Sequence, residues 1–187
     1  MINWHRTIGR INQSFHRGME LVIVLLKALP ISILVGVLVW FILSKLESKH
    51  EWIVRKKKFI TGLAFYVMLL LQMGILSRPF GSERGVEWIP FMKTGGYYLV
   101  IMFSLANIII FIPFGMLVPK VFDKVNAWWK VALVACGFSI FVELVQFALG
   151  CGVSEVEDVI MNTIGGVIGY LILRAIQKRR SKRLEID

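Results

Sequence analysis

Apolar residues gather along this chain in long stretches that short charged segments separate. A helix needs about 20 largely apolar residues to cross a hydrocarbon layer of roughly 30 Å. Stretches of this length occupy residues 19–44, 59–77, 97–118, 127–149 and 158–176. The first stretch is the least regular, because Lys27 and Pro30 interrupt it and can kink a helix. The pattern predicts an all-α integral membrane protein, a helical bundle of about five transmembrane helices.

The segment before the first stretch has a helical period of its own. Trp4, Ile8, Ile11 and Phe15 recur at spacings of four, three and four, so they share one face of a helix. Its basic residues fall largely on the other faces. We expect residues 1–18 to form an amphipathic helix in the membrane interface. A first span and a basic cytoplasmic loop would follow at 19–58, then a four-span transmembrane domain at 59–176 and a basic cytoplasmic tail at 177–187.

Composition agrees with a membrane location. Hydrophobic residues make up 57% of the 187 residues, charged residues 18%, and the mean hydropathy is +0.70. That is more apolar surface than one small core can bury, so lipid must cover the rest. The net charge of +10 resembles that of a nucleic-acid binder. The basic residues lie mostly between the apolar stretches, however, as in loops at a charged membrane surface. We therefore expect membrane lipids, and no nucleic acid, as partners.

The distribution of Lys and Arg predicts an orientation. With five spans, one side of the membrane collects Lys45, Lys49, Arg55, Lys56, Lys57, Lys58, Lys120, Lys124, Lys130, Arg174, Lys178, Arg179, Arg180, Lys182 and Arg183. The other side has only Arg6, Arg10, Arg17, Arg78, Arg84 and Lys93. Because cytoplasmic loops carry an excess of basic residues, we expect the carboxyl terminus in the cytoplasm. A basic segment directly before a first span is more typical of the inner side, so the side of the amino terminus stays open.

Polar side chains inside the spans mark a candidate site, because they are costly in lipid and by default face protein or water. Glu143 and Gln146 share a face of the fourth span, and Asp158 and Asn162 share a face of the fifth. On the predicted topology all of them lie near the outer surface, with Asn107 of the third span at the floor of an outward-facing pocket. Arg84 in the 78–96 link is a candidate cationic partner for the carboxylates. The candidate ligand-binding residues are Arg84, Asn107, Glu143, Gln146, Asp158 and Asn162.

Simpler explanations exist for some of these patterns. Ser154 and Glu157 fit a capping box, which would make the acidic residues there a helix start. Gly165 and Gly169, four residues apart, form a small-residue face for close helix packing. The 78–96 link is rich in Pro and Gly and is expected to be irregular, and a solvated loop explains it as well as a cap over the pocket does.

Metal and cofactor chemistry is not indicated. His5, His16 and His50 all lie far along the chain from the candidate pocket. Cys136 and Cys151 would be about 22 Å apart along a continuous helix, too far for a disulfide. Neither has a neighbour at metal-ligand spacing. We expect no metal ion and no cofactor.

Four separated motifs resemble those of the VanZ-like membrane proteins of bacteria. They are Arg-Gly-Val-Glu-Trp-Ile-Pro-Phe at 84–91, Ile-Phe-Ile-Pro-Phe-Gly-Met-Leu-Val-Pro at 110–119, Glu143 with Gln146, and Glu-Asp-Val-Ile-Met-Asn-Thr-Ile-Gly-Gly at 157–166. The resemblance covers about residues 75–173 in the order of that family. It departs where many members carry Arg shortly before the acidic cluster and this chain has Gly152. If that Arg normally pairs with the pocket acids, either Arg84 does so here or the acids are partly protonated.

The resemblance implies low-level resistance to teicoplanin-type glycopeptides at the cell envelope, and it implies no established reaction. One hypothesis is a binding protein whose pocket holds a polar lipid or cell-wall precursor head group, such as that of an undecaprenyl-linked or other anionic lipid. The second is a membrane enzyme with Glu143 and Asp158 as an acid and base pair. The third is a small lipid transporter or scramblase that uses a third span kinked at Pro113. The oligomeric state stays open.

Overall fold

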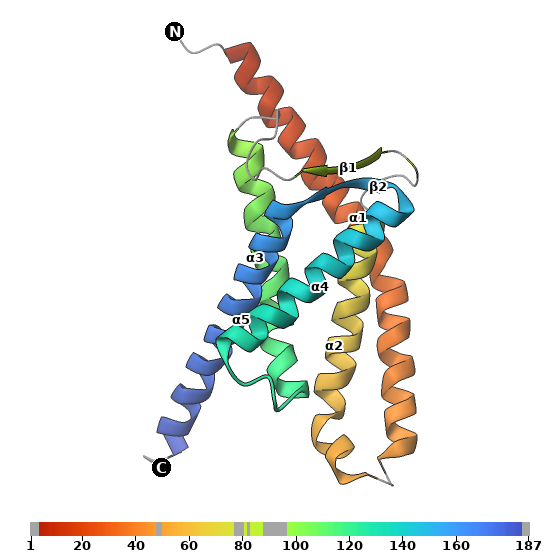
Figure 1. Cartoon of the computed structure of the whole chain (residues 1–187), viewed down its shortest axis with the longest axis vertical. Helices are drawn as coiled ribbons and strands as arrows, with labels where there is room; N and C mark the ends of the chain where they lie inside the picture. The colour runs from red at the N-terminus through yellow and green to blue at the C-terminus, as the bar shows by residue number, and fades with distance from the viewer. Residues whose placement is uncertain (1–3, 48–49, 77–80, 82, 88–96, 185–187) are drawn as a thin grey trace.

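The computed structural model describes residues 4–47, 50–76, 81, 83–87 and 97–184 (Figure 1). Its helices are α1 (Trp4–Leu46), α2 (Glu51–Leu76), α3 (Tyr97–Val121), α4 (Trp128–Leu149) and α5 (Val156–Leu184), and its short strands are β1 (Glu83–Glu87) and β2 (Cys151–Glu155). Successive helices run in opposite directions, so the two termini lie at opposite ends of the molecule (Figure 1). The strands lie toward the end at which the amino terminus is found. We call this the strand end.

All five helices contain a segment long and apolar enough to cross a membrane, which confirms the predicted all-α bundle of five spans. Lipid offers backbone N–H and C=O groups no hydrogen-bond partners, and a helix satisfies them within itself. Large apolar side chains such as Leu34, Ile109 and Leu133 remain exposed on the outer faces of the bundle. These faces suit hydrocarbon, and the chain is a multi-pass membrane protein.

Helix α1 continues without interruption from Trp4 through Lys27 and Pro30 to Leu46. The segment 4–18 is thus the beginning of the helix that also carries the first span. Its location in the membrane interface, and the division of the chain at 18, 58 and 176, stay predictions.

Buried hydrogen bonds of Gln72 join α1 to α2 toward the strand end of their spans. The Gln72 side-chain amide of α2 donates to the Ala28 carbonyl of α1 at 3.1 Å and to Ser32 Oγ at 2.9 Å. Both Gln72 and Ser32 are buried. Polar groups in hydrocarbon need such partners, so these bonds fix which faces of α1 and α2 meet.

Glycines bring α3 and α5 into backbone contact. A Cβ atom added to Gly115 of α3 would lie 1.9 Å from the carbonyl oxygen of Gly166. On α5, a Cβ at Gly165 would lie 2.3 Å from the Ile108 carbonyl oxygen, and one at Gly169 would lie 2.1 Å from that of Ile112. No side chain fits at these distances. The small-residue face predicted at 165 and 169 is confirmed, and the helix it receives is α3.

An aromatic core lies beside this contact. Phe114 of α3 stacks on Phe138 of α4, with ring centroids 5.0 Å apart, and Phe111 contacts both rings. Leu63 and Leu70 of α2 pack into the same cluster. The aromatic core therefore joins α2, α3 and α4 around one centre.

The link predicted to be irregular contains a strand, so that prediction is wrong for residues 83–87. Strand β1 pairs in parallel with β2, in a register that runs from Glu83 opposite Cys151 to Glu87 opposite Glu155. Five residues are too few to show a clear alternation of apolar and polar positions. The pairing depends on a partner segment more than 60 residues away in the sequence, which local patterns do not reveal.

The same pairing changes the start of α5. Ser154 lies within β2, and α5 begins at Val156, so the predicted capping box with Ser154 as N-cap is wrong. The Ser154 hydroxyl instead donates to the carbonyl oxygen of Glu143 at 3.0 Å. Gly150, with φ of 63°, ends α4 in the left-handed conformation and turns the chain into β2.

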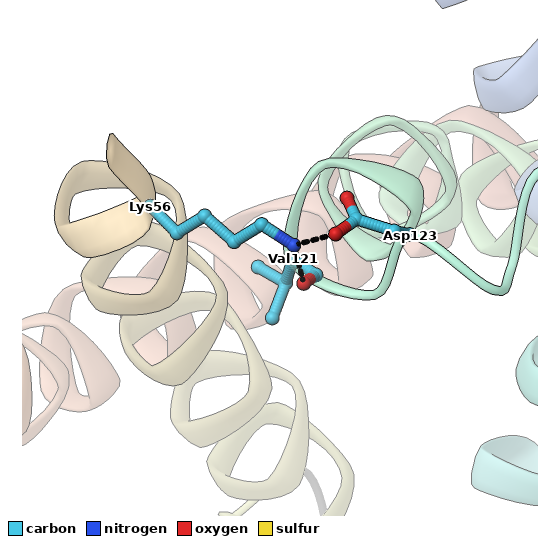
Figure 2. A network of polar contacts seen from close by, with 3 residues as sticks. All are labelled: Lys56, Val121 and Asp123. Atoms are coloured by element: carbon cyan, nitrogen blue, oxygen red, sulfur yellow. Dashed lines mark hydrogen bonds and ion pairs between the residues drawn. The ribbon is translucent and has the colours of Figure 1, made fainter. Parts of the chain in front are cut away.

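The opposite end of the bundle is held by basic side chains. Lys56 of α2 donates to the Val121 carbonyl at the last residue of α3, at 3.0 Å, and to Asp123 Oδ2 at 2.5 Å (Figure 2). The C-terminal end of a helix carries partial negative charge, so a cation stabilises it there. Arg174 and Tyr170 of α5 both donate to the Asn126 carbonyl in the turn that follows α3. We call this the basic end.

Candidate functional site

Polar side chains of α3, α4 and α5 meet at the strand end of the bundle, where β2 leads into α5. We call this group the polar cluster. It comprises Ser104, Asn107, Ser139, Glu143, Glu157, Asp158 and Asn162.

Helix α3 supplies two donors to two adjacent carboxylates. Asn107 Nδ2 donates to Asp158 Oδ1 at 2.6 Å. Three residues earlier on α3, the Ser104 hydroxyl donates to Glu157 Oε1. Asp158 and Glu157 lie in the first turn of α5, where the exposed backbone N–H groups also favour negative charge. The start of α5 is thereby fixed against α3 by side chains, just as its middle is fixed by glycines.

These two pairs differ in exposure. Ser104 and Glu157 are buried, at 8% and 5% exposed, whereas Asn107 and Asp158 are only half-buried. A molecule approaching the strand end could therefore reach the amide of Asn107 and the carboxylate of Asp158 more readily than the pair beside them.

Glu143 connects α4 to the strand that precedes α5. Its Oε2 atom accepts a hydrogen bond from the Glu155 backbone N–H at 3.1 Å, while its own carbonyl oxygen accepts one from Ser154. The side chain is buried. Glu143 thus holds β2 in place and positions the first turn of α5.

Asn162 and Ser139 form a layer one helical turn deeper. Asn162 Nδ2 donates to Ser139 Oγ at 2.8 Å, and both side chains are buried. The Asn162 carbonyl oxygen Oδ1 is buried without a hydrogen-bond partner in the described part of the chain. Asp158 and Asn162 share a face of α5 as predicted, but Asp158 is bonded to α3 and Asn162 to α4.

The remaining two candidates lie differently. The Gln146 amide donates to the Gly74 carbonyl of α2 at 3.0 Å, so the structure directs it to α2 and does not join it to the acidic residues of α5. The backbone of Arg84 lies in β1 opposite Gly152. Its side chain lies outside the described part of the structure, and the predicted pairing with Glu143 or Asp158 stays a prediction.

Sequence reasoning missed three serines of this site. Ser104, Ser139 and Ser154 all hydrogen-bond to acidic or amide residues of the polar cluster. Serine is common in spans and often bonds to its own helix, so its type alone gives no signal. The spacing of Ser104 and Asn107, three residues apart on one face of α3, was the available signal.

Comparison with known proteins identifies the family. The sequence model of the VanZ/LLP1 family matches residues 31–177, most of the chain. The chain belongs to the VanZ/LLP1 family. Protein VanZ of Enterococcus faecium is 33% identical to it over 129 residues, which cover 69% of this chain and 76% of that protein. No solved structure matches.

The VanZ/LLP1 match contains every residue of the polar cluster and both strands, and it begins one residue after Pro30 of α1. The features of the site therefore belong to the part of the chain that is shared with the VanZ/LLP1 family. Within the described residues, no group of three or more His, Cys, Asp or Glu side chains is placed to hold a metal ion.

Proposed function

We propose that this VanZ-type protein binds the polar head group of a membrane lipid or cell-wall precursor at its polar cluster. By doing so at the bacterial cell envelope, it lowers susceptibility to teicoplanin-type glycopeptides. The phenotype comes from the family resemblance, and the binding role comes from the chemistry of the cluster.

The main support for this proposal is a difference in burial. The Asn107–Asp158 pair is half-buried, and the polar residues that surround it are buried. Glu143, Glu157, Ser104 and Asn162 are buried and bonded between elements. They hold α3, α5 and β2 together. Asp158 retains exposed surface beside these buried residues. A purely structural cluster would have no need to leave its most polar pair accessible at the membrane boundary.

The side chains indicate the class of ligand. Carboxylates accept hydrogen bonds, so Asp158 favours hydroxyl, amide N–H or ammonium groups. The Asn107 amide can donate as well as accept. Head groups built of sugars and peptides, such as those of undecaprenyl-linked precursors, offer such groups. A phosphate in the same head group would need a cation, and Arg84 lies on β1 at this end of the bundle.

The distribution of charge supports an outward-facing site. The basic end collects most of the Lys and Arg residues, which favours the cytoplasmic side for that end and for the carboxyl terminus. The strand end would then face outward, where cell-wall precursors are displayed and where glycopeptides act.

Isosteric substitutions test the proposal. Glu143→Gln and Asp158→Asn remove one charge each, and their amide oxygens can still accept the hydrogen bonds from the Glu155 N–H and from Asn107. Asp123→Asn makes the same chemical change at the basic end and serves as the control. Teicoplanin and vancomycin susceptibility is measured in a host that expresses each form at matched membrane levels.

We expect the wild type and Asp123→Asn to raise the inhibitory concentration of teicoplanin, and Asp158→Asn to return it to that of cells without the protein. Equal protection by all forms would reject the polar cluster as the working site. Incubation of the purified protein with a labelled undecaprenyl-linked lipid then separates retention of intact lipid, which supports binding, from turnover, which supports an enzyme.

A further inference from the structure

Carboxylates at the basic end are paired with neighbouring cations. Lys56 binds Asp123 at 2.5 Å (Figure 2), Lys57 binds Glu47 at 2.8 Å, and Arg55 lies 3.9 Å from Glu51. These three pairs include every acidic side chain that the structure describes on α2, in the segment before α2 and in the segment after α3. The other basic residues there have no such partner in the described part of the chain.

Two of those remaining cations converge on one aromatic ring. Lys58 Nζ of α2 lies 5.1 Å from the centroid of the Phe59 ring, and Lys120 Nζ of α3 lies 4.8 Å from the same centroid. Helices α2 and α3 are in contact one turn deeper, where Gly62 faces Leu117. The juxtaposition is therefore set by the packing of two helices.

Because both ammonium groups lie near one centroid, they are no more than about 10 Å apart. Like charges within this range repel each other, and the repulsion grows where water is scarce. The face of an aromatic ring offsets part of this cost. An anion lying between the two ammonium groups would offset it far better. The surrounding medium at this depth is the head-group layer of a membrane, and its common anion is the lipid phosphate.

We infer that Lys58, Phe59 and Lys120 form a binding site for the phosphate of an anionic phospholipid, in the leaflet at the basic end of the bundle. The two lysines contact the phosphate from α2 and α3, and the ring supports them at the edge of the hydrocarbon. This site lies at the opposite end of the molecule from the polar cluster and does not depend on the proposed function.

The site differs from general attraction to a charged surface. The end of α5 carries Lys178, Arg179, Arg180, Lys182 and Arg183, all exposed. Those side chains attract any anionic membrane without a defined geometry. A specific site predicts that neutralising two lysines at Phe59 weakens lipid binding more than neutralising two on the tail.

Native mass spectrometry of the full chain in detergent measures this difference directly. The protein is titrated with phosphatidylglycerol and separately with phosphatidylcholine, with inorganic phosphate as a competitor. The variants are Lys58→Gln with Lys120→Gln, the charge-matched control Lys178→Gln with Lys182→Gln, and the charge-preserving Lys58→Arg with Lys120→Arg. The melting temperature of each variant without lipid establishes that it is folded.

We expect phosphatidylglycerol to bind more tightly than phosphatidylcholine. A juxtamembrane lysine contributes about fivefold to the binding of anionic lipid, so the paired Gln variant should weaken binding on the order of 30-fold. The Arg variant should bind like the wild type, and the tail control should lose clearly less binding than the paired Gln variant. Equal loss in the Gln variant and the tail control would overturn the site in favour of general charge attraction. Unchanged binding in the folded Gln variant would also overturn it, and displacement of the lipid by millimolar inorganic phosphate would overturn its assignment to a lipid.

Discussion

Asn107 of α3 and Asp158 of α5 are joined by a hydrogen bond of 2.6 Å at the strand end of the bundle. The helices come this close because Gly165, two turns further along α5, packs its backbone against the Ile108 carbonyl. The polar contact at the start of α5 thus depends on a close backbone contact further along the helix. A ligand that engages Asp158 engages a side chain whose position is set by both.

A double-mutant cycle on this pair measures its strength. We expect Asn107→Ala and Asp158→Ala each to destabilise the protein, with a coupling energy of about 1–2 kcal/mol, since one partner is a carboxylate. The free energy of unfolding in mixed micelles, followed by loss of helical circular dichroism, gives the four values. Additivity within about 0.3 kcal/mol would show that the pair contributes no interaction of its own.

The glycine contact predicts a position-specific cost of adding one methyl group. Gly169→Ala places a Cβ atom 2.1 Å from the Ile112 carbonyl oxygen and should destabilise the protein by about 1–3 kcal/mol. Gly137→Ala is the control, because no neighbouring side chain or other helix of the described structure lies within 4 Å of its added Cβ. That control should be neutral or slightly stabilising. Equal melting temperatures of the two variants in detergent would contradict the close approach of α3 and α5.

We predict that the buried hydrogen bonds of Gln72 stabilise the contact between α1 and α2. Gln72→Leu removes the hydrogen bonds to Ala28 and Ser32 and should cost about 1 kcal/mol. Ser32→Ala should cost less, because the Ala28 carbonyl still accepts from Gln72. Thermal unfolding in detergent compares the variants, and a Ser32→Ala variant less stable than Gln72→Leu would argue against this division of roles.

The register of β1 and β2 predicts that an arginine can act from position 152 in place of position 84. Arg84 and Gly152 are cross-strand partners in β1 and β2, and neighbouring partners project from the same face of a sheet. We expect Arg84→Gly to abolish glycopeptide protection and Gly152→Arg, added to that variant, to restore it. Susceptibility at matched membrane levels reads out both variants. A double variant as inactive as Arg84→Gly would show that the guanidinium is needed on β1 itself.

The sequence predicted the helices well because each span needs only local information. Length, apolar content and flanking charge determine a transmembrane helix, and all five spans were found from these alone. The close packing at Gly165 and Gly169 was also predictable, since small residues four apart have few other uses in a span. Its partner helix was not predictable, because Gly115 lies 50 residues earlier in the chain.

The candidate site was harder to predict because its contacts join distant segments. Asn107 and Asp158 stand out in the sequence as polar residues inside predicted spans, but only the fold reveals that they are in direct contact. Glu143 was expected to line a pocket, and the structure shows it bonded to the backbone of β2. Strand β2 itself overrides the capping pattern at Ser154, because pairing with β1 satisfies its backbone. Local signals fail where a tertiary partner supplies the hydrogen bonds.

The backbone contact between α3 and α5 has a mechanical consequence. At Gly115, Gly165 and Gly169 the two backbones lie so close that no side chain fits between the helices. We therefore expect α3 and α5 to move together as one unit. A movement that opens or closes the strand end would then come from the elements packed around α3 and α5. These are α4, the α1–α2 hairpin and the paired strands β1 and β2.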